Sequence, residues 1–343
     1  HQWDPYHTPH AAALAVKLFG KRPKLLDKVV RLVKSKELID TIGLTQHITA
    51  PYLPEDYKKD LGHYVVDQVV HVEASWHHQK GKGVVEETAF IESLPFQQHD
   101  LKLGALVATA DPRDSNFKKI LKMHNQASPH FRGIRKMASF HEDKGIYAWT
   151  DEPHLYRNKK FLKGFELLAQ YNLSFDAWTY STQLSDVIAL AKQFPETSIV
   201  LDHLGTPAGL FGAVGKHTGL TKTARENIFF HWQEDIAELA MLPNVYTKMS
   251  GLMMPVLGHH FHQKHQLASK EQVFELVHPL ITHALQSFGL YRVIFASNFP
   301  MDSVSSSLVN IIDAFSDVVA AYDPDALEQV FRKNAMQFYR VKS

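Results

Sequence analysis

Short apolar runs alternate with longer amphipathic segments through most of the sequence. Seven runs end at a turn signal or a polar residue, as buried strands do. They cover residues 65–73, 103–108, 133–137, 173–178, 198–202, 244–248 and 293–296. Apolar residues three and four positions apart predict helices at 117–123, 160–171, 184–194, 232–240, 271–287, 305–321 and 324–339. Strands that alternate with helices of this length predict parallel βαβ units.

The segment before the first predicted strand is mostly helical. Apolar periodicity predicts helix between residues 10 and 42, a proline-containing loop at 50–57 and a short helix at 55–61. Seven strands need one more, at or just upstream of His1, to close a barrel. We therefore predict an α/β fold, a single-domain (β/α)8 TIM barrel over residues 1–343. The alternative is an open doubly wound sheet, but no glycine-rich phosphate loop follows any strand, which disfavours a dinucleotide-binding version.

Polar and ionisable residues lie at the end of nearly every predicted strand. A barrel would gather these residues at one mouth, where such folds place their chemistry. They are His1, Glu73, Arg135, Asp176, His203, Lys248 and Asn298.

His203 follows a strand directly, and imidazole suits a metal ligand or a proton shuttle. Arg135 and Lys248 are candidates to bind a substrate carboxylate or carbonyl, with Glu73, Asp176 and Trp178 as further substrate contacts. A capping histidine, a structural ion pair and a surface lysine remain open as alternatives. Because neighbouring strand residues point to opposite faces, only one of Asp202 and His203 is expected to face the mouth.

Composition narrows the class of protein. The 343 residues are 45% hydrophobic and 21% charged, with a net charge of +1. This balance predicts neither a nucleic-acid nor a membrane partner, so a small-molecule substrate is expected. There is no cysteine, so any metal would need His, Asp or Glu ligands. No signal peptide or transmembrane run is evident, and we take the cytoplasm as the default location. The oligomeric state is left open.

Five motifs together resemble a known family. They are His-Gln-Trp-Asp-Pro at 1–5, Gly-Ile-Arg at 133–135, Leu-Asp-His-Leu-Gly-Thr-Pro at 201–207, Asn-Val-Tyr-Thr-Lys-Met-Ser-Gly at 244–251 and Phe-Ala-Ser-Asn-Phe-Pro at 295–300. Their order and spacing resemble the amidohydrolase superfamily, in its lactonase-like branch of metal-dependent hydrolases related to fuconolactonase and pyrone-dicarboxylate lactonase. The resemblance implies a barrel that hydrolyses a lactone. It also implies metal ligation by His1, as the second histidine of a His-x-His pair, and by His203.

The chain departs from the family pattern at Asn298, where an aspartate is usual. A carboxylate can take a proton from water and neutralise a divalent cation, whereas a carboxamide does neither. The expected cofactor is therefore one zinc ion that is bound weakly or not at all. The catalytic candidates are His203, Asn298 and Asp302, and the base would be Asp302, His203 acting without metal, or a metal hydroxide.

The function predicted from the sequence is hydrolysis of a small sugar-acid or dicarboxylate lactone, or of a related ester or amide, by attack of water on a polarised carbonyl. Two alternatives stay open. One is a barrel that binds its ligand without turnover, and the other is a non-oxidative decarboxylase of the same superfamily.

Overall fold

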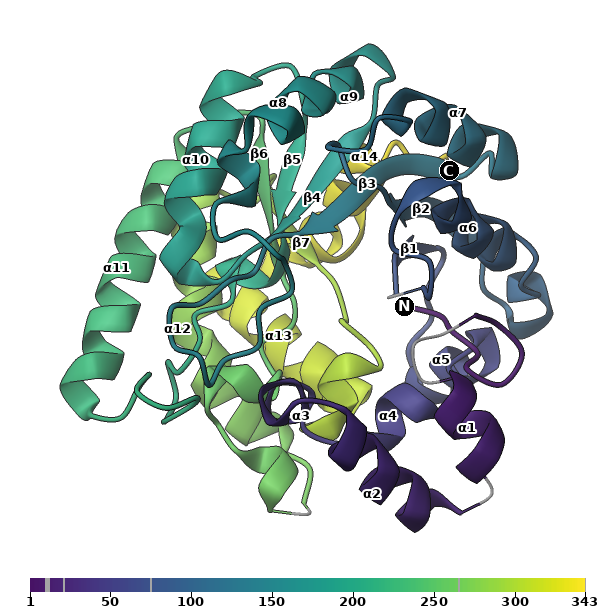
Figure 1. Cartoon of the computed structure of the whole chain (residues 1–343). Helices are drawn as coiled ribbons and strands as arrows, with labels where there is room; N and C mark the ends of the chain where they lie inside the picture. Colours follow the sequence, from purple (N-terminus) through teal and green to yellow (C-terminus); the bar gives the residue numbers. More distant parts are fainter. Residues whose placement is uncertain (10–12, 21, 75, 265, 343) are drawn as a thin grey trace.

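One parallel sheet forms the centre of the molecule. The computed structural model describes residues 1–9, 13–20, 22–74, 76–264 and 266–342. The sheet has seven strands in the order in which they occur along the chain (Figure 1). They are β1 (Val69–Val72), β2 (Leu103–Thr109), β3 (Phe131–Met137), β4 (Ser174–Trp178), β5 (Ile199–Leu201), β6 (Val245–Met249) and β7 (Val293–Phe295). All seven strands predicted from the sequence are present.

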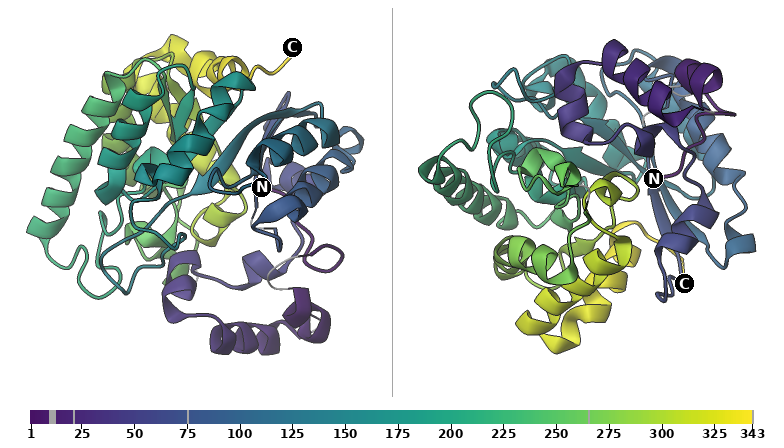
Figure 2. Two further views of the ribbon diagram at one scale, coloured as in Figure 1. Left: turned by 45° about the horizontal axis from the view of Figure 1, so that its top comes forward. Right: turned by 90° about the horizontal axis from the view of Figure 1, so that it is seen from below.

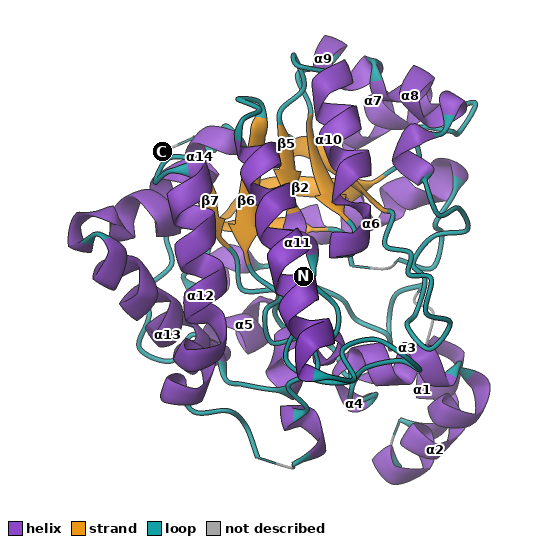
Figure 3. Cartoon of the chain, turned by 90° about the vertical axis from the view of Figure 1, so that its left-hand side faces the viewer, coloured by secondary structure: helices purple, strands orange, loops and turns teal. Residues whose placement is uncertain are grey.

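Helices surround the outer face of the curled sheet, so that the strands lie inside a layer of helices (Figure 3). The α-helices are α1 (Ala13–Phe19), α2 (Pro23–Val33), α3 (Lys36–Ile42), α4 (Gln46–Thr49), α5 (Pro54–Asp60), α6 (Val85–Glu92), α7 (Phe117–Ala127), α8 (Lys159–Phe165), α9 (Leu167–Gln170), α10 (Leu184–Gln193), α11 (Lys222–Ala240), α12 (Lys270–Phe288), α13 (Leu308–Tyr322) and α14 (Asn334–Phe338). Each strand from β1 to β7 is followed by at least one of them, which confirms the predicted βαβ alternation.

Strand β2 is an example of a strand whose two faces are both apolar and buried. Ala105 and Val107 lie on the inner side of the curled sheet, in a cluster that includes Ile294 of β7. Leu106 and Ala108 alternate with them and belong to the larger cluster beneath the helices. Both faces of the sheet are therefore buried, as is usual for parallel sheets covered by crossover helices.

The sheet is a curled, incomplete barrel. Among the described residues β1 pairs only with β2 and β7 only with β6, so these two strands form its edges. His1 lies between the two ends. Its backbone nitrogen donates to the carbonyl of Phe299, at 3.2 Å, and its ring Nδ1 lies 2.7 Å from the carbonyl of Val72. The eighth strand expected upstream of His1 falls outside the described residues and stays a prediction.

Several element boundaries differ from the prediction. β1 begins at Val69 rather than at residue 65, because pairing with β2 begins only there. α11 begins ten residues before the predicted start at 232, since Thr221 caps it by accepting a hydrogen bond from the backbone nitrogen of Ala224. The helix predicted at 160–171 is divided into α8 and α9, and α6 was not predicted.

Two further helical predictions need correction at the chain ends. The helix expected at 324–339 consists of a 3-10 turn at Pro324–Ala326, a π-helical turn at Gln329–Lys333 and then α14. The segment expected to be helical at 10–42 is divided into α1, α2 and α3, and its first three residues lie outside the described part.

Helices α1 to α4 form an N-terminal lobe that lies beside the barrel (Figure 2). α3 packs against the turn Pro255–Leu257, which follows β6, and α4 packs against the turn Met301–Val304, which follows β7. These turns lie at the carboxyl ends of the strands. The lobe therefore borders the mouth of the barrel, the end at which the candidate site residues gather.

Candidate active site

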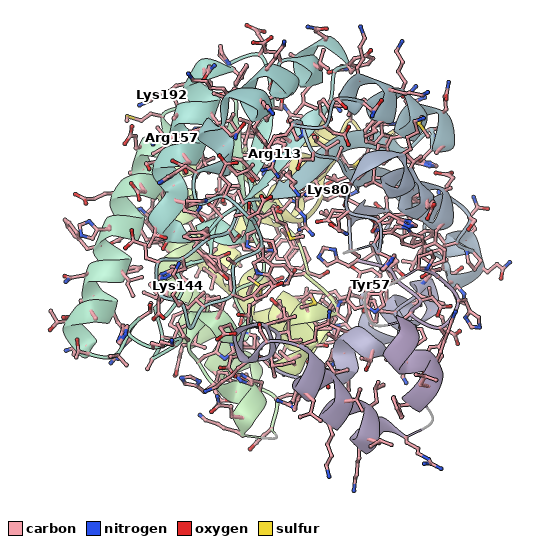
Figure 4. All side chains as sticks on the ribbon, viewed as in Figure 1. Tyr57, Lys80, Arg113, Lys144, Arg157 and Lys192 are labelled. Carbon is pink, nitrogen blue, oxygen red and sulfur yellow. The ribbon has the colours of Figure 1, made fainter. Side chains whose placement is uncertain are left out.

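A cavity of about 510 Å³ extends from the mouth of the curled sheet along the gap between its edge strands β1 and β7, where the eighth strand expected upstream of His1 would lie. Five of the predicted site residues line it, together with Asp202. They are His1, Arg135, His203, Lys248 and Asn298. Val70, Phe295 and Phe331 line the cavity where it runs along this gap. Tyr57 of α5, labelled in Figure 4, contributes to the wall as well. Side chains from distant parts of the sequence thus share one mouth, as the barrel prediction required.

His203 sits in a left-handed turn directly after β5. The turn Asp202–Gly205 has φ values of 57° at His203 and 49° at Leu204, so strand alternation stops at Leu201. As a result, Asp202 and His203 both line the cavity. The expectation that only one of them would face the mouth was wrong, because it assumed that the strand continued through residue 203.

The environment of His203 keeps its ring neutral and oriented. Its Nδ1 lies 2.8 Å from Oγ of Ser250, and the Trp178 ring meets it edge to face at a centroid distance of 5.5 Å. The indole Nε1 of Trp178 donates to Oγ1 of Thr206 at 2.9 Å, which fixes the tryptophan. Burial lowers the pKa of His203 to about 4, so the imidazole is neutral at pH 7.

Gly251 makes room for His203. A Cβ at this position would lie 2.5 Å from Nδ1 of His203, and the backbone has a φ of +63°.

We expect Gly251→Ala to lower the free energy of unfolding by about 2–4 kcal/mol, because the strain of the positive φ and the steric overlap with His203 both destabilise the fold. It should also displace the imidazole and abolish most activity. Urea denaturation together with kcat/KM would measure both effects. Gly289→Ala is the matched control, since Gly289 has a φ of +71° with no atom within 4 Å of its Cβ position. That variant should show the backbone strain without loss of activity.

Arg135 and Lys248 are linked by buried carboxylates. Nε of Arg135 donates to Oε1 of Glu73 at 2.8 Å, and its Nη1 lies 3.3 Å from Oδ2 of Asp202. Nζ of Lys248 lies 2.8 Å from Oδ1 of Asp202 and also bonds to Asp176. Two cationic and three acidic side chains thus form one network inside the barrel. Removal of one partner from such a buried network typically costs about 3–5 kcal/mol.

The network sets the protonation of its members. Burial raises the pKa of Asp202, but Lys248, His203 and Arg135 outweigh burial and hold that pKa below its ordinary value. Burial raises the pKa of Asp176 to about 6, although Lys248 opposes the shift. Burial also lowers the pKa of Lys248, but the two aspartates outweigh it and leave the pKa above its usual value. Both cations therefore stay charged at neutral pH.

Asn298 separates Asp302 from the cavity. Its Nδ2 donates to Oδ1 of Asp302 at 2.7 Å, and its Oδ1 lies 3.4 Å from Nε2 of His1. Asp302 also accepts from the backbone nitrogen of Met253 at 3.3 Å and is 1% exposed. Burial raises the pKa of Asp302 to about 7. The carboxyl group is therefore poised near neutrality, but Asn298 lies between it and His1.

The predicted residues thus fall into two groups. One group lines the cavity, as given above. The other group does not line the cavity but contacts residues that do. Glu73 accepts a hydrogen bond from Arg135, Asp176 forms an ion pair with Lys248, Trp178 packs against His203, and Asp302 accepts a hydrogen bond from Asn298. Substrate contact by Glu73, Asp176 and Trp178 stays a prediction.

At the mouth, the described residues offer His1, His203 and the neutral amide of Asn298 in place of the usual aspartate, and the partner of His1 in the expected His-x-His pair would lie upstream of the sequence. Nδ1 of His1 contacts the carbonyl of Val72 and Nδ1 of His203 contacts Oγ of Ser250, so each ring could offer only its Nε2 to a metal ion. The third donor would be the neutral side-chain amide of Asn298, whose Nδ2 is bonded to Asp302. Among the described residues, no group of three or more His, Cys, Asp or Glu side chains is placed to hold a metal ion. This includes the described part of the histidine-rich segment 259–265, whose His265 lies outside the described residues.

Three contributors were not among the predicted site residues. Ser250 and Asp202 lie at strand ends, so their positions alone would have nominated them. Tyr339 was treated as part of a packing helix, but its hydroxyl donates to Oδ2 of Asp176 at 2.8 Å inside the barrel. No sequence pattern links Tyr339 to Asp176, because only the return of the C-terminal segment brings them together.

Comparison with known proteins places this geometry in context. A family model described as Amidohydrolase matches residues 51–341. An L-fucono-1,5-lactonase from Burkholderia ambifaria is 25% identical over 271 residues, which are 75% of this chain and 81% of that protein.

Two solved structures share the architecture. An amidohydrolase from Burkholderia multivorans with bound zinc has a TM-score of 0.68 at 20% identity, covering 86% of this chain and 90% of its own. A probable 2-pyrone-4,6-dicarboxylic acid hydrolase from Acinetobacter baumannii with citric acid bound has a TM-score of 0.56 at 13% identity, covering 85% and 90%. At these identities the two structures establish a common fold.

Proposed function

The chain belongs to the amidohydrolase family, and we propose that it hydrolyses a small lactone. The observation that carries the proposal is the shared cavity, in which a neutral histidine, His203, lies with the cationic side chains of Arg135 and Lys248. A base and positive charge at one site suit the attack of water on a carbonyl. The names of the relatives support a lactone as the substrate.

His203 acts as the general base in this proposal. The proposal takes the tautomer in which Nδ1–H donates to Oγ of Ser250, 2.8 Å away, so that Nε2 keeps a lone pair to accept a proton from water. The water oxygen bonds to the lactone carbonyl carbon, and the negative charge develops on the carbonyl oxygen. The ring C–O bond then breaks, and the proton on Nε2 passes to the departing ring oxygen. The product is the open hydroxy acid.

Arg135 and Lys248 face the developing negative charge from the cavity wall. Their own charges are balanced by Glu73, Asp176 and Asp202, so they supply a preorganised field rather than an unpaired cation. Preorganised dipoles and charges of this kind lower a barrier without reorganisation at the moment of reaction.

His1 and Asn298, which also line the cavity, orient the water or the substrate in this proposal. Asp302 fixes the Asn298 amide through its Oδ1. Asp302 is the second candidate for the base, because burial raises its pKa to about 7. We favour His203 because it lines the cavity and Asp302 does not.

The reaction proceeds in this proposal without a tightly held zinc ion. Zinc sites in enzymes usually combine three protein ligands with an open position. Here the position that would supply the carboxylate is Asn298, and its oxygen is a neutral, weaker ligand. The Burkholderia multivorans amidohydrolase, which shares this fold, was solved with bound zinc, and the proposal departs from it in this respect.

Turnover of a lactone panel tests the proposed function. The panel contains sugar-acid lactones such as L-fucono-1,5-lactone and dicarboxylate lactones such as 2-pyrone-4,6-dicarboxylate, each assayed by acid release with and without chelator. We expect hydrolysis of at least one class, unchanged by chelator. Uniform inactivity with ligand-induced thermal stabilisation would instead identify a binding protein. Release of carbon dioxide would identify a decarboxylase.

A further inference from the structure

The N-terminal lobe lies outside the segment 51–341 that matches the family. In Figures 1 and 2, α1 and α2 lie at the outer edge of the molecule. The inner side of α2 is accounted for by packing, since Leu26 and Val30 are each 4% exposed and join a small cluster with Ile39 and Ile42. The outer side of α2 makes no contribution to that cluster.

The outer side of α2 combines leucine and lysine. Leu25 and Leu32 are seven residues apart and therefore share one helix face, and they are 37% and 85% exposed. Lys28 lies between them on the same face, three and four residues away, and Lys24 lies one turn before Lys28. Both lysines are exposed. At the end of α1, Leu18 is 67% exposed.

Positive charge is concentrated in the same stretch. Residues 17–36 contain eight Lys and Arg residues and one acidic residue, whereas the whole chain carries a net charge of only +1. The near-zero net charge of the whole chain therefore does not reveal that this segment is strongly basic. Segments that lie in a membrane interface combine exposed leucines with a polar face rich in lysine and arginine, and the outer side of α2 offers both kinds of residue.

We propose that the outer face of α2, formed by Lys24, Leu25, Lys28 and Leu32, docks on the surface of an anionic lipid bilayer. The leucines enter the boundary between headgroups and acyl chains, and the lysines extend to the lipid phosphates. The contact is peripheral, since none of the helices that the structure describes has the length and apolar character needed to cross a bilayer.

Other occupants fit this face less well. A second copy of the chain would bring two strongly basic segments together, which like-charge repulsion opposes. A nucleic acid would engage the lysines but leave Leu25 and Leu32 in water. A partner protein would bind the helix in a groove. A bilayer is flat and deformable, and it offers acyl chains to the leucines and phosphates to the lysines along the whole face, so we favour the bilayer.

Co-sedimentation of the full chain with vesicles tests the proposal. The probes are phosphatidylcholine vesicles with and without phosphatidylglycerol. We expect binding to the anionic vesicles alone. Because each basic residue near such a surface contributes about fivefold, Lys24→Glu/Lys28→Glu should lower the partition coefficient by about 30-fold or more. Leu25→Ser/Leu32→Ser should lower it by about 50-fold.

The matched control is Lys118→Glu/Lys119→Glu, which makes the same charge change at exposed lysines of α7. It should leave the partition coefficient unchanged within about threefold. Circular dichroism and thermal melting of every variant distinguish weaker lipid binding by a folded protein from unfolding of the protein. Absence of wild-type binding to anionic vesicles would overturn the proposal. So would duplex DNA binding of equal strength that is insensitive to the leucine substitutions, or sedimentation of the chain as a dimer through this face.

Discussion

His203→Asn is expected to lower kcat/KM for lactone hydrolysis by about 10²–10⁴-fold, the usual contribution of a positioned general base. The asparagine amide keeps a polar group near Oγ of Ser250, which lies 2.8 Å from Nδ1 of His203 in the wild type. It removes Nε2, the atom proposed to take the proton from water. The measurement is steady-state hydrolysis of the best lactone of the panel, with urea denaturation as a check on folding.

His124→Asn is the matched control for this experiment. His124 of α7 is fully buried, and burial lowers its pKa to about 4, as at His203. Its ring bonds to Thr88 and to the carbonyl of Thr109, away from the cavity. This variant should lose stability but keep kcat/KM. If His203→Asn retained activity within about threefold of the wild type, His203 would not be the base, and Asp302 would become the first candidate.

Asn298→Asp is expected to convert the mouth into a zinc site. In the wild type, Nδ2 of Asn298 and Oδ1 of Asp302 are 2.7 Å apart. Two carboxylates at that separation cannot both ionise unless a proton or a cation lies between them. We therefore expect the variant to be purified with close to one zinc ion per chain, and the wild type with far less. Elemental analysis after gentle purification measures both.

The same substitution has a pH dependence that can be measured without zinc. The carboxylate pair raises the folded-state pKa of one member above its unfolded value of about 4. Its contribution to stability is therefore fully present below that value and is lost as the pH rises through the raised pKa. Because burial already raises the pKa of Asp302 to about 7 in the wild type, the wild type also loses stability over this range. We expect metal-free Asn298→Asp to lose about 1–2 kcal/mol more than the wild type between pH 5 and pH 8.

Asn172→Asp provides the control, because Asn298 and Asn172 both have a positive φ, 51° and 52°, but Asn172 is exposed and does not line the cavity. It should gain neither zinc nor pH dependence. A stoichiometric, tightly held zinc in the wild-type protein would contradict the proposed metal-independent reaction.

The sequence identified the strands well because the inner strands of the sheet, such as β2 and β4, are buried on both faces. An apolar run such as Leu103–Thr109 is visible without any knowledge of its neighbours. Helix starts were harder to predict. The first turns of α11 lack apolar periodicity, and its beginning depends on the cap at Thr221. The C-terminal segment was predicted to pack as a helix, but it places the Tyr339 hydroxyl on Asp176 through a contact between residues 163 positions apart.

The sequence by itself determined the parallel alternation of strands and helices, the polar residues at the strand ends and the carboxamide at Asn298. These properties are local, since each is written in a few neighbouring residues. Only the tertiary structure decided that Asp202 and His203 face the cavity together, that Asn298 covers Asp302, and that the positive charge of the N-terminal lobe gathers on an exposed helix face. The reason is physical: a left-handed turn, a hydrogen bond between side chains and the exposure of a helix face all depend on what packs nearby, and a sequence pattern records only what comes next along the chain.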